Sequence, residues 1–237
     1  MQTLFIDIET FGNKPDYPEV EQVTADDVKI GNIKNPEKIA AKIAETLPTL
    51  QQAAKDKAEE AFQKEWRGNA VKSTRCEVIA VSLAFDDGPI QNLTIDNEGE
   101  IGLMHKLNQI LADIDPDHRI IDVVAHNGFG FDFPILRHRG LRYGLKHLYE
   151  AFNVTKYDTR AKDTQVMFQG SDIRTYYSMD SLAEFFGFEG KSIMTGAEVH
   201  DYFLRGEIDL IAEYCGKDVE ALRKLYRKLT RFDGIQP

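Results

Sequence analysis

The chain has little cysteine and no long apolar run. Its 237 residues include two cysteines, Cys76 and Cys215, which lie far apart in the sequence. This sparse use excludes a disulfide framework and indicates reduced thiols in a cytoplasmic protein. No stretch approaches the roughly 20 apolar residues of a membrane span. The N-terminal segment MQTLFIDIET lacks the basic and apolar regions of a signal peptide. The sequence therefore predicts a cytoplasmic protein without a membrane partner.

Positive charge is also scarce. The chain has 29 lysines and arginines against 39 aspartates and glutamates, which gives a formal net charge of −10. This balance argues against a protein that coats nucleic acid through a general basic surface. It is compatible with an enzyme that grips a strand end locally, because bound metal ions would offset the charge of active-site carboxylates.

The first part of the chain predicts a strand followed by a helical insertion. The segment LFIDIE (4–9) is apolar enough for a central strand that is covered on both faces. Residues 14–68 differ in character: one helix is expected to begin at Asn35-Pro36, and a second to run from Pro48 to about Trp66. The apolar stripe of this region is too thin for a core of its own. We therefore expect a single domain over residues 1–237, with a helical insertion at about 14–68.

Strands and helices alternate in the rest of the chain. Residues 76–96 predict a hairpin and residues 120–126 a β-branched strand. Helices are expected over 98–113, from about 133 to 142, and from about 209 to 231. This order is typical of an α/β fold with a mixed sheet.

Two carboxylates in the first strand need an explanation. Asp7 and Glu9 are two residues apart and so point to one face, about 7 Å apart along the strand, while Leu4 and Ile6 point to the other. Like charges on one face of a central strand repel each other and are costly to desolvate. A pair of this kind also occurs at exposed strand ends, so it is weak evidence by itself.

A third carboxylate lies on an apolar helix face. The stripe of the last helix runs through Ile211, Cys215 and Leu222, and Asp218 falls within it. Tyr214 lies four residues before Asp218 and shares its face. A cation at Asp218 would explain this placement, and so would a simple Tyr–Asp contact at the edge of the core.

The segment AHNGFGFDFPIL (125–136) supplies a fourth carboxylate, Asp132, at the start of a helix. Asp132 could be no more than a helix cap, and Asn127 no more than a turn residue. Taken together, however, four carboxylates from a strand, a helix start and a late helix could converge on one site. Hard divalent cations with oxygen ligands are the natural compensation, and zinc is disfavoured because nitrogen and sulfur ligands are missing at useful spacing.

The segments FIDIET, NGFGFD and YCGKD resemble, in order and separation, the three motifs of the DEDD superfamily of 3′–5′ exonucleases. The spacing of Tyr214 and Asp218 is similar to the tyrosine (DEDDy) branch, since Glu213 stands where the histidine branch carries histidine. The chain looks most like stand-alone bacterial and phage exonucleases related to the proofreading domain of B-family DNA polymerases. The resemblance implies an RNase H-like fold with a five-stranded mixed sheet flanked by helices.

The resemblance also implies the site. Two divalent cations, Mg²⁺ or Mn²⁺, would be held by Asp7, Glu9, Asp132 and Asp218, and Tyr214 would orient the attacking water. The residues that would contact substrate are Thr10 and Phe11 at the terminal nucleotide, Asn127 and Phe131 in the second motif, and Lys191 at a phosphate. Phe131 is equally compatible with a core position. The basic cluster at 137–147 could guide the strand, although a solvated helix face is the simpler interpretation.

The resulting hypothesis is a two-metal 3′–5′ exonuclease. It would act on the 3′ end of DNA, with single strands favoured, and release nucleoside 5′-monophosphates in phage or bacterial DNA replication or repair. Alternatives are a 3′–5′ exoribonuclease acting on RNA and a non-catalytic module that binds nucleic-acid ends. A replication or recombination protein would be a further partner.

Overall fold

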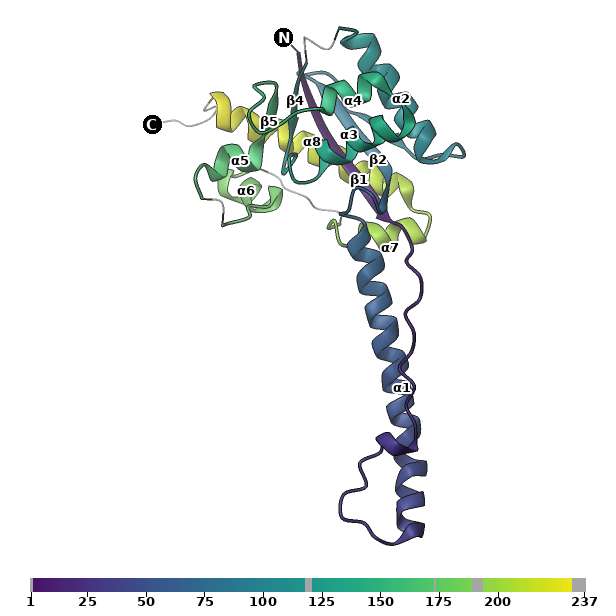
Figure 1. The fold of residues 1–237 in the computed structure, drawn as a ribbon. Coiled ribbons are helices and arrows are strands. Elements are labelled where there is room, and N and C mark those ends of the chain that lie inside the picture. Colours follow the sequence, from purple (N-terminus) through teal and green to yellow (C-terminus); the bar gives the residue numbers. More distant parts are fainter. Residues whose placement is uncertain (1, 118–120, 173, 189–193, 232–237) are drawn as a thin grey trace. The chain divides into compact units, whose positions relative to one another are not determined.

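The computed structural model describes residues 2–117, 121–172, 174–188 and 194–231. Two compact units are distinguished: residues 1–12 with 70–237 form the first, and residues 13–69 form the second (Figure 1). The first unit contains the sheet, and the second contains the predicted helical insertion.

The sheet of the first unit has five strands among the described residues, in the order β3-β2-β1-β4-β5. β1 pairs antiparallel with β2 and parallel with β4, so the sheet is mixed, as predicted. The expected hairpin is the antiparallel pair β2 and β3. The sequence did not indicate β5, which is three residues long and pairs parallel with β4. The strands are β1 (Gln2–Gly12), β2 (Cys76–Phe85), β3 (Gln91–Thr94), β4 (Ile121–Ala125) and β5 (Ala161–Asp163).

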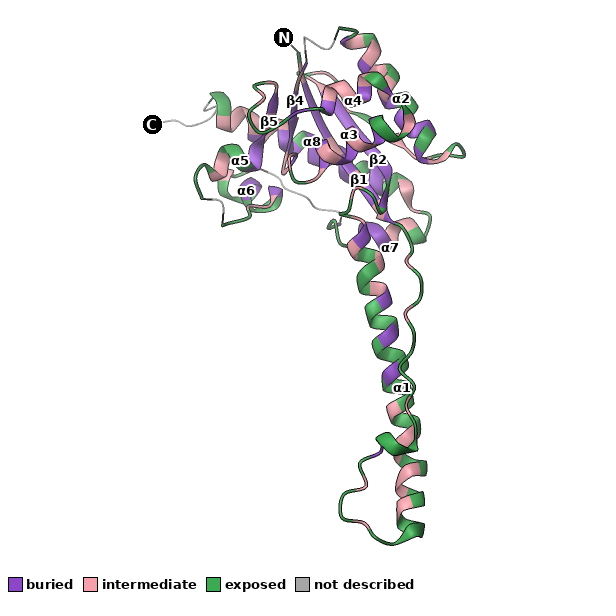
Figure 2. Cartoon of the chain, viewed as in Figure 1, coloured by how far each residue is buried: buried purple, intermediate pink, exposed green. Residues whose placement is uncertain are grey.

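Helices pack on both faces of the sheet (Figures 1 and 2). Leu4, Ile6 and Ile8 of β1 join one buried cluster with residues of α2, α3 and α4. Phe5 joins a second cluster with residues of α6 and α8 on the opposite face. The helices of this unit are α2 (Gly99–Ile114), α3 (Asp132–Tyr143), α4 (Lys146–Phe152), α5 (Thr164–Gln169), α6 (Met179–Phe186), α7 (Val199–Leu204) and α8 (Ile208–Arg231). This double cover explains why residues 4–6 of the first strand are apolar on both faces.

The second unit contains one long helix, α1 (Pro36–Asn69), and a short 3-10 helix, η1 (Ala25–Asp27). The prediction of two helices with a break at Pro48 is wrong, because Pro48 lies inside α1. A proline removes one backbone hydrogen bond, and strong helix formers on both sides carry the helix through it. The buried apolar positions of α1 are Ala54, Ala58 and Phe62, a single stripe at four-residue spacing.

In the part of the chain that the structure describes, no helix combines the length and apolar character needed to cross a membrane.

Candidate active site

The central strand presents two carboxylates to α8. Asp7 and Glu9 follow Phe5 on the face that packs against α8, in agreement with the two-residue period. The Cys215 thiol of α8 donates a hydrogen bond to the backbone oxygen of Asp7, with a sulfur–oxygen distance of 3.2 Å. This contact joins the late helix to the first strand at the position of the carboxylates.

Asp218 completes a group of three acids. Its side chain lies on the buried face of α8 and is 4% exposed. Asp7, Glu9 and Asp218 each offer a carboxylate oxygen, and these three oxygens lie within 4.8 Å of one another. Burial raises the pKa of the neighbouring Cys215 thiol well above its usual range, and the charges of Asp7 and Glu9 add to this effect. Three crowded carboxylates match the oxygen donor set that hard divalent cations prefer.

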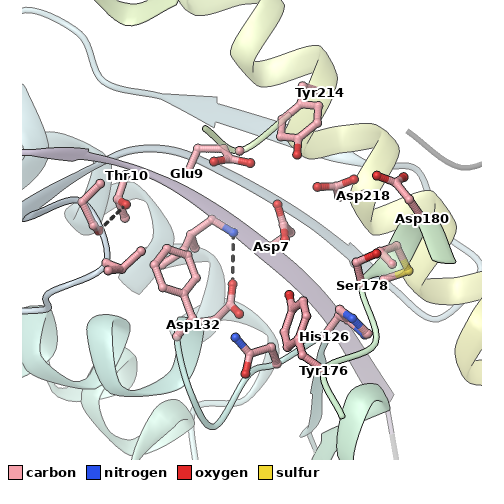
Figure 3. Close-up of a pocket in the computed structure, with 17 residues that line it drawn as sticks. Asp7, Glu9, Thr10, His126, Asp132, Tyr176, Ser178, Asp180, Tyr214 and Asp218 are labelled. Carbon is pink, nitrogen blue, oxygen red and sulfur yellow. Dashed lines mark hydrogen bonds between the residues drawn. The ribbon is translucent and has the colours of Figure 1, made fainter. Parts of the chain in front are cut away.

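Asp132 lies beside this group but is not one of its three members among the described residues. It is the first residue of α3 and is 2% exposed. Phe131 occupies the cap position of the helix, so Asp132 does not act as the cap. Its Oδ1 instead accepts a hydrogen bond of 3.2 Å from the backbone nitrogen of Ile8 (Figure 3). Burial, followed by the negative charge of Asp7, raises the pKa of Asp132 well above its usual range.

The acids lie in a pocket of about 360 Å³, within the size range of ligand sites (Figure 3). Tyr214 is 1% exposed, and its hydroxyl points into the pocket between Glu9 and Asp218. The lining residues predicted from the sequence are Asp7, Glu9, Thr10, Asn127, Phe131, Asp132, Tyr214 and Asp218. Residues from a strand, a turn and a late helix thus meet in one cavity.

Two predicted substrate contacts are not among these lining residues. Phe11 packs elsewhere: its ring stacks on His200 at a centroid distance of 4.8 Å and contacts Phe203 of α7 at 4.6 Å. The contact of Phe11 with the terminal nucleotide stays a prediction, since Phe11 does not line this pocket. Lys191 lies outside the described residues.

One wall of the pocket was not predicted. It contains His126 together with Tyr176, Ser178 and Asp180. Nε2 of His126 lies 2.8 Å from the backbone oxygen of Tyr177, which only accepts, so Nε2 carries the proton. This bond joins the end of β4 to the segment that leads into α6. Tyr176 is 63% exposed and offers an aromatic face at the pocket. His126 directly follows β4, Tyr176 and Ser178 lie before α6, and Asp180 lies in its first turn, so no single periodic pattern connects them in the sequence.

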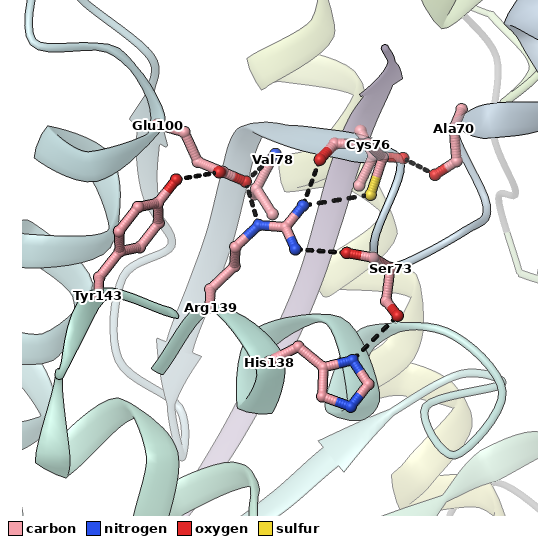
Figure 4. Close-up of polar contacts among 9 residues, drawn as sticks. Ala70, Ser73, Cys76, Val78, Glu100, His138, Arg139 and Tyr143 are labelled. Carbon is pink, nitrogen blue, oxygen red and sulfur yellow. Dashed lines mark hydrogen bonds and ion pairs between the residues drawn. The ribbon is translucent and has the colours of Figure 1, made fainter. Parts of the chain in front are cut away.

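Part of the basic cluster is not available to nucleic acid. Arg139 is 2% exposed, and its guanidinium pairs with Glu100 and donates to the backbone oxygens of Ser73 and Cys76 (Figure 4). Burial by itself would lower the pKa of Arg139, but the hydrogen bond and charge of Glu100 raise it. Arg139 therefore supports the fold and does not guide a strand.

A family model described as a predicted 3′–5′ exonuclease related to the exonuclease domain of PolB matches residues 70–235. The match contains Asp132, Tyr214 and Asp218, and it begins after the segment with Asp7 and Glu9. A comparison with curated proteins finds no match.

Among solved structures, the chain is similar to the family B DNA polymerase from the hyperthermophilic archaeon Pyrobaculum calidifontis. The TM-score is 0.59 and the identity 17%, over 98% of this chain and 25% of the polymerase chain. The chain thus spans about a quarter of that polymerase. At this identity the likeness speaks for the fold alone, and it confirms the predicted RNase H-like arrangement of a five-stranded mixed sheet flanked by helices.

Proposed function

The chain belongs to the family of predicted 3′–5′ exonucleases related to the exonuclease domain of PolB, hydrolases that act on phosphodiester bonds, and from this premise we propose its substrate and its chemistry. It removes nucleotides from the 3′ end of DNA, with single strands preferred. Asp7, Glu9, Asp132 and Asp218 hold two divalent cations, Mg²⁺ or Mn²⁺. The observation that carries this proposal is the group of three carboxylates within 4.8 Å of one another in a pocket.

The cations and the side chains of the pocket have different roles in the proposed reaction. When bound, the cations supply a nucleophilic water at neutral pH and stabilise the charge that develops on the scissile phosphate. Tyr214 orients the attacking water through its hydroxyl, while Thr10, Asn127 and Phe131 contact the terminal nucleotide. The oxygen of water bonds to phosphorus as the bond from phosphorus to the 3′ oxygen breaks. The 3′ oxygen takes up a proton, equivalent to the one that the attacking water loses, and leaves as a hydroxyl, and the released product is a nucleoside 5′-monophosphate.

The direct test is a time course on end-labelled single-stranded DNA, duplex DNA and RNA, with Mg²⁺ or Mn²⁺ and with EDTA. The proposal expects a ladder that shortens from the 3′ end, mononucleotide products and no reaction in EDTA. Degradation of RNA with DNA left intact would replace the DNA substrate by RNA. Binding of strand ends without any release would leave a non-catalytic module.

Replacing Tyr214 with phenylalanine is expected to lower kcat by about 100-fold, because the buried ring remains and only the hydroxyl that orients water is lost. KM for single-stranded DNA should change little. Steady-state kinetics measures both quantities. Tyr226→Phe on the same helix is the matched control and should keep the wild-type kcat, since Tyr226 packs against Phe5 outside the pocket lining. Equal kcat in the two variants would remove Tyr214 from the mechanism.

We also propose that the 13–69 unit is an insertion into a single exonuclease domain. The support lies in the strand register, because Gly12 at the end of β1 pairs directly with Cys76 at the start of β2. The chain therefore leaves the sheet and returns to it at neighbouring positions. A variant with a short glycine–serine linker in place of residues 13–69 should keep one cooperative urea transition. Loss of that transition would show that the core depends on the unit.

A further inference from the structure

A buried carboxylate outside the pocket lining accepts hydrogen bonds from four backbone amides. Asp163 is the last residue of β5 and is 3% exposed. It accepts hydrogen bonds from the backbone nitrogens of Asn127 at 2.9 Å, Phe129 at 3.1 Å, Gln165 at 3.0 Å and Val166 at 3.4 Å. Bonds from backbone N–H groups to a carboxylate are stronger than bonds between neutral groups. Through these bonds, Asp163 connects the turn after β4 with the first turn of α5.

The two carboxylate oxygens serve different elements. Oδ1 accepts from Gln165 and Val166 in the first turn of α5, and it also accepts from Asn127. Oδ2 accepts from Phe129. One oxygen thus acts mainly as the cap of α5, and the other belongs to the turn that leads to Asp132.

The 127–131 turn depends on hydrogen bonds from other segments of the chain. Asn127 has a φ of 59°, in the left-handed region that residues other than glycine seldom adopt and that asparagine tolerates better than most. A Cβ atom at Gly130 would lie 2.5 Å from the side-chain oxygen of Asn127, so the turn is also tightly folded on itself. Backbone strain of this kind persists where surrounding contacts hold it in place. Asp163 supplies such contacts at Asn127 and at Phe129.

We propose that Asp163 is a positioning residue of the active site. It holds the 127–131 turn so that Asn127 and Phe131 face the pocket and the Asp132 carboxylate reaches the backbone of β1. The proposal rests on the proposed exonuclease function. It differs from a purely structural role as the cap of α5, which would leave the turn and the site unaffected.

Asp163→Asn separates the two roles. Asparagine caps helices about as well as aspartate, so its carbonyl can keep the bonds to α5. Its amide group, however, places a donor opposite the Phe129 N–H, where Oδ2 accepted. In the metal-free protein, hydrogen–deuterium exchange at the backbone amide of Phe129, which bonds to Oδ2, is expected to accelerate, while exchange at Val166, which bonds to Oδ1, stays at the wild-type rate. We expect kcat on single-stranded DNA to fall by roughly 10- to 100-fold.

Asp115→Asn is the matched control. Asp115 is also buried, accepts from the backbone nitrogen of Ile121 at 3.2 Å and does not line the pocket. The Asp115→Asn variant should lower the free energy of unfolding. It should not accelerate exchange in the 127–131 turn, and well below the unfolding temperature it should not change kcat. Asp163→Ser, a shorter cap residue, serves as a second variant and should show the same exchange pattern as Asp163→Asn.

Two results would overturn the proposal. One is wild-type exchange at Phe129 in both Asp163 variants. The other is a wild-type kcat in a variant whose turn exchanges faster. If the wild-type enzyme releases no nucleotides, the exonuclease proposal fails first, and the exchange pattern still tests whether Asp163 holds the turn.

Discussion

Asp218→Asn is expected to abolish nucleotide release and, at the same time, to stabilise the metal-free protein. In the wild type, three carboxylates offer oxygens within 4.8 Å of one another. At an effective dielectric constant near 20, one such like-charge pair costs on the order of 3–4 kcal/mol before ionisation adjusts to it. Asparagine keeps the shape of the side chain and removes one charge, so the free energy of unfolding without metal should rise by about 1 kcal/mol or more.

The loss of activity follows from the same change. A metal site contributes several kcal/mol to transition-state stabilisation, so kcat/KM should fall by about a thousandfold or more. Urea denaturation with EDTA and with Mn²⁺ measures the stability side. Mn²⁺ should stabilise the wild type by about 2.7 kcal/mol at a concentration 100 times its Kd, and it should stabilise Asp218→Asn far less.

Glu220→Gln is the matched control for this prediction. Glu220 lies two residues further along α8, is exposed and pairs with Lys224. Removing its charge should change neither kcat/KM nor the stabilisation by Mn²⁺. If Asp218→Asn instead keeps the full response to Mn²⁺, the carboxylate group does not hold the metal.

The sequence indicates which carboxylates of β1 and α8 line the pocket, because local periodicity determines their directions. A two-residue period places Asp7 and Glu9 on one strand face, and the spacing of Tyr214 and Asp218 places both on one helix face. The order of strands and helices predicted a mixed sheet, but its five strands came from the family resemblance, since β5 has only three residues and carries no pattern of its own.

The features that the sequence did not predict depend mainly on contacts between distant segments of the chain. Asp163 meets the 127–131 turn because β5 pairs in parallel with β4, with Asp163 opposite Ala125. Phe11 packs outside the pocket lining because α7 supplies its ring partners from a segment almost 200 residues later in the sequence. In α1, the local rule for proline predicted a break that the neighbouring residues do not allow. In each case tertiary packing or neighbouring residues override the local signal.

Arg139→Leu is expected to lower the free energy of unfolding by about 3–5 kcal/mol, because removing one partner of a buried ion pair leaves the other charge uncompensated. The side chains of Arg139 and Glu100 are 2% and 4% exposed. Glu100 also accepts from the backbone nitrogen of Val78 at 2.7 Å and from the Tyr143 hydroxyl at 2.5 Å (Figure 4). Burial and then the bond to Glu100 raise the pKa of Tyr143 to about 12, so the phenol remains a donor at neutral pH.

The position of this network explains why its loss should be costly. Arg139 donates to the backbone oxygens of Ser73 and Cys76, where the chain re-enters the sheet, and Thr10 donates to the backbone oxygen of Ala70 at 2.7 Å. A lysine at position 139 has no planar fork to reach both carbonyls, so Arg139→Lys should recover only part of the stability.

Urea denaturation of single and double variants separates charge from packing in this network. Adding Glu100→Gln to Arg139→Leu removes the stranded charge and should restore part of the loss, since a neutral amide is less costly to bury than a carboxylate. Arg142→Leu, an exposed member of the same basic cluster, should cost about 1 kcal/mol or less. If Arg139→Leu and Arg142→Leu have the same effect, the buried pair is not a determinant of stability. If adding Glu100→Gln lowers the free energy of unfolding further, the hydrogen bonds of Glu100, and not its charge, stabilise the start of β2.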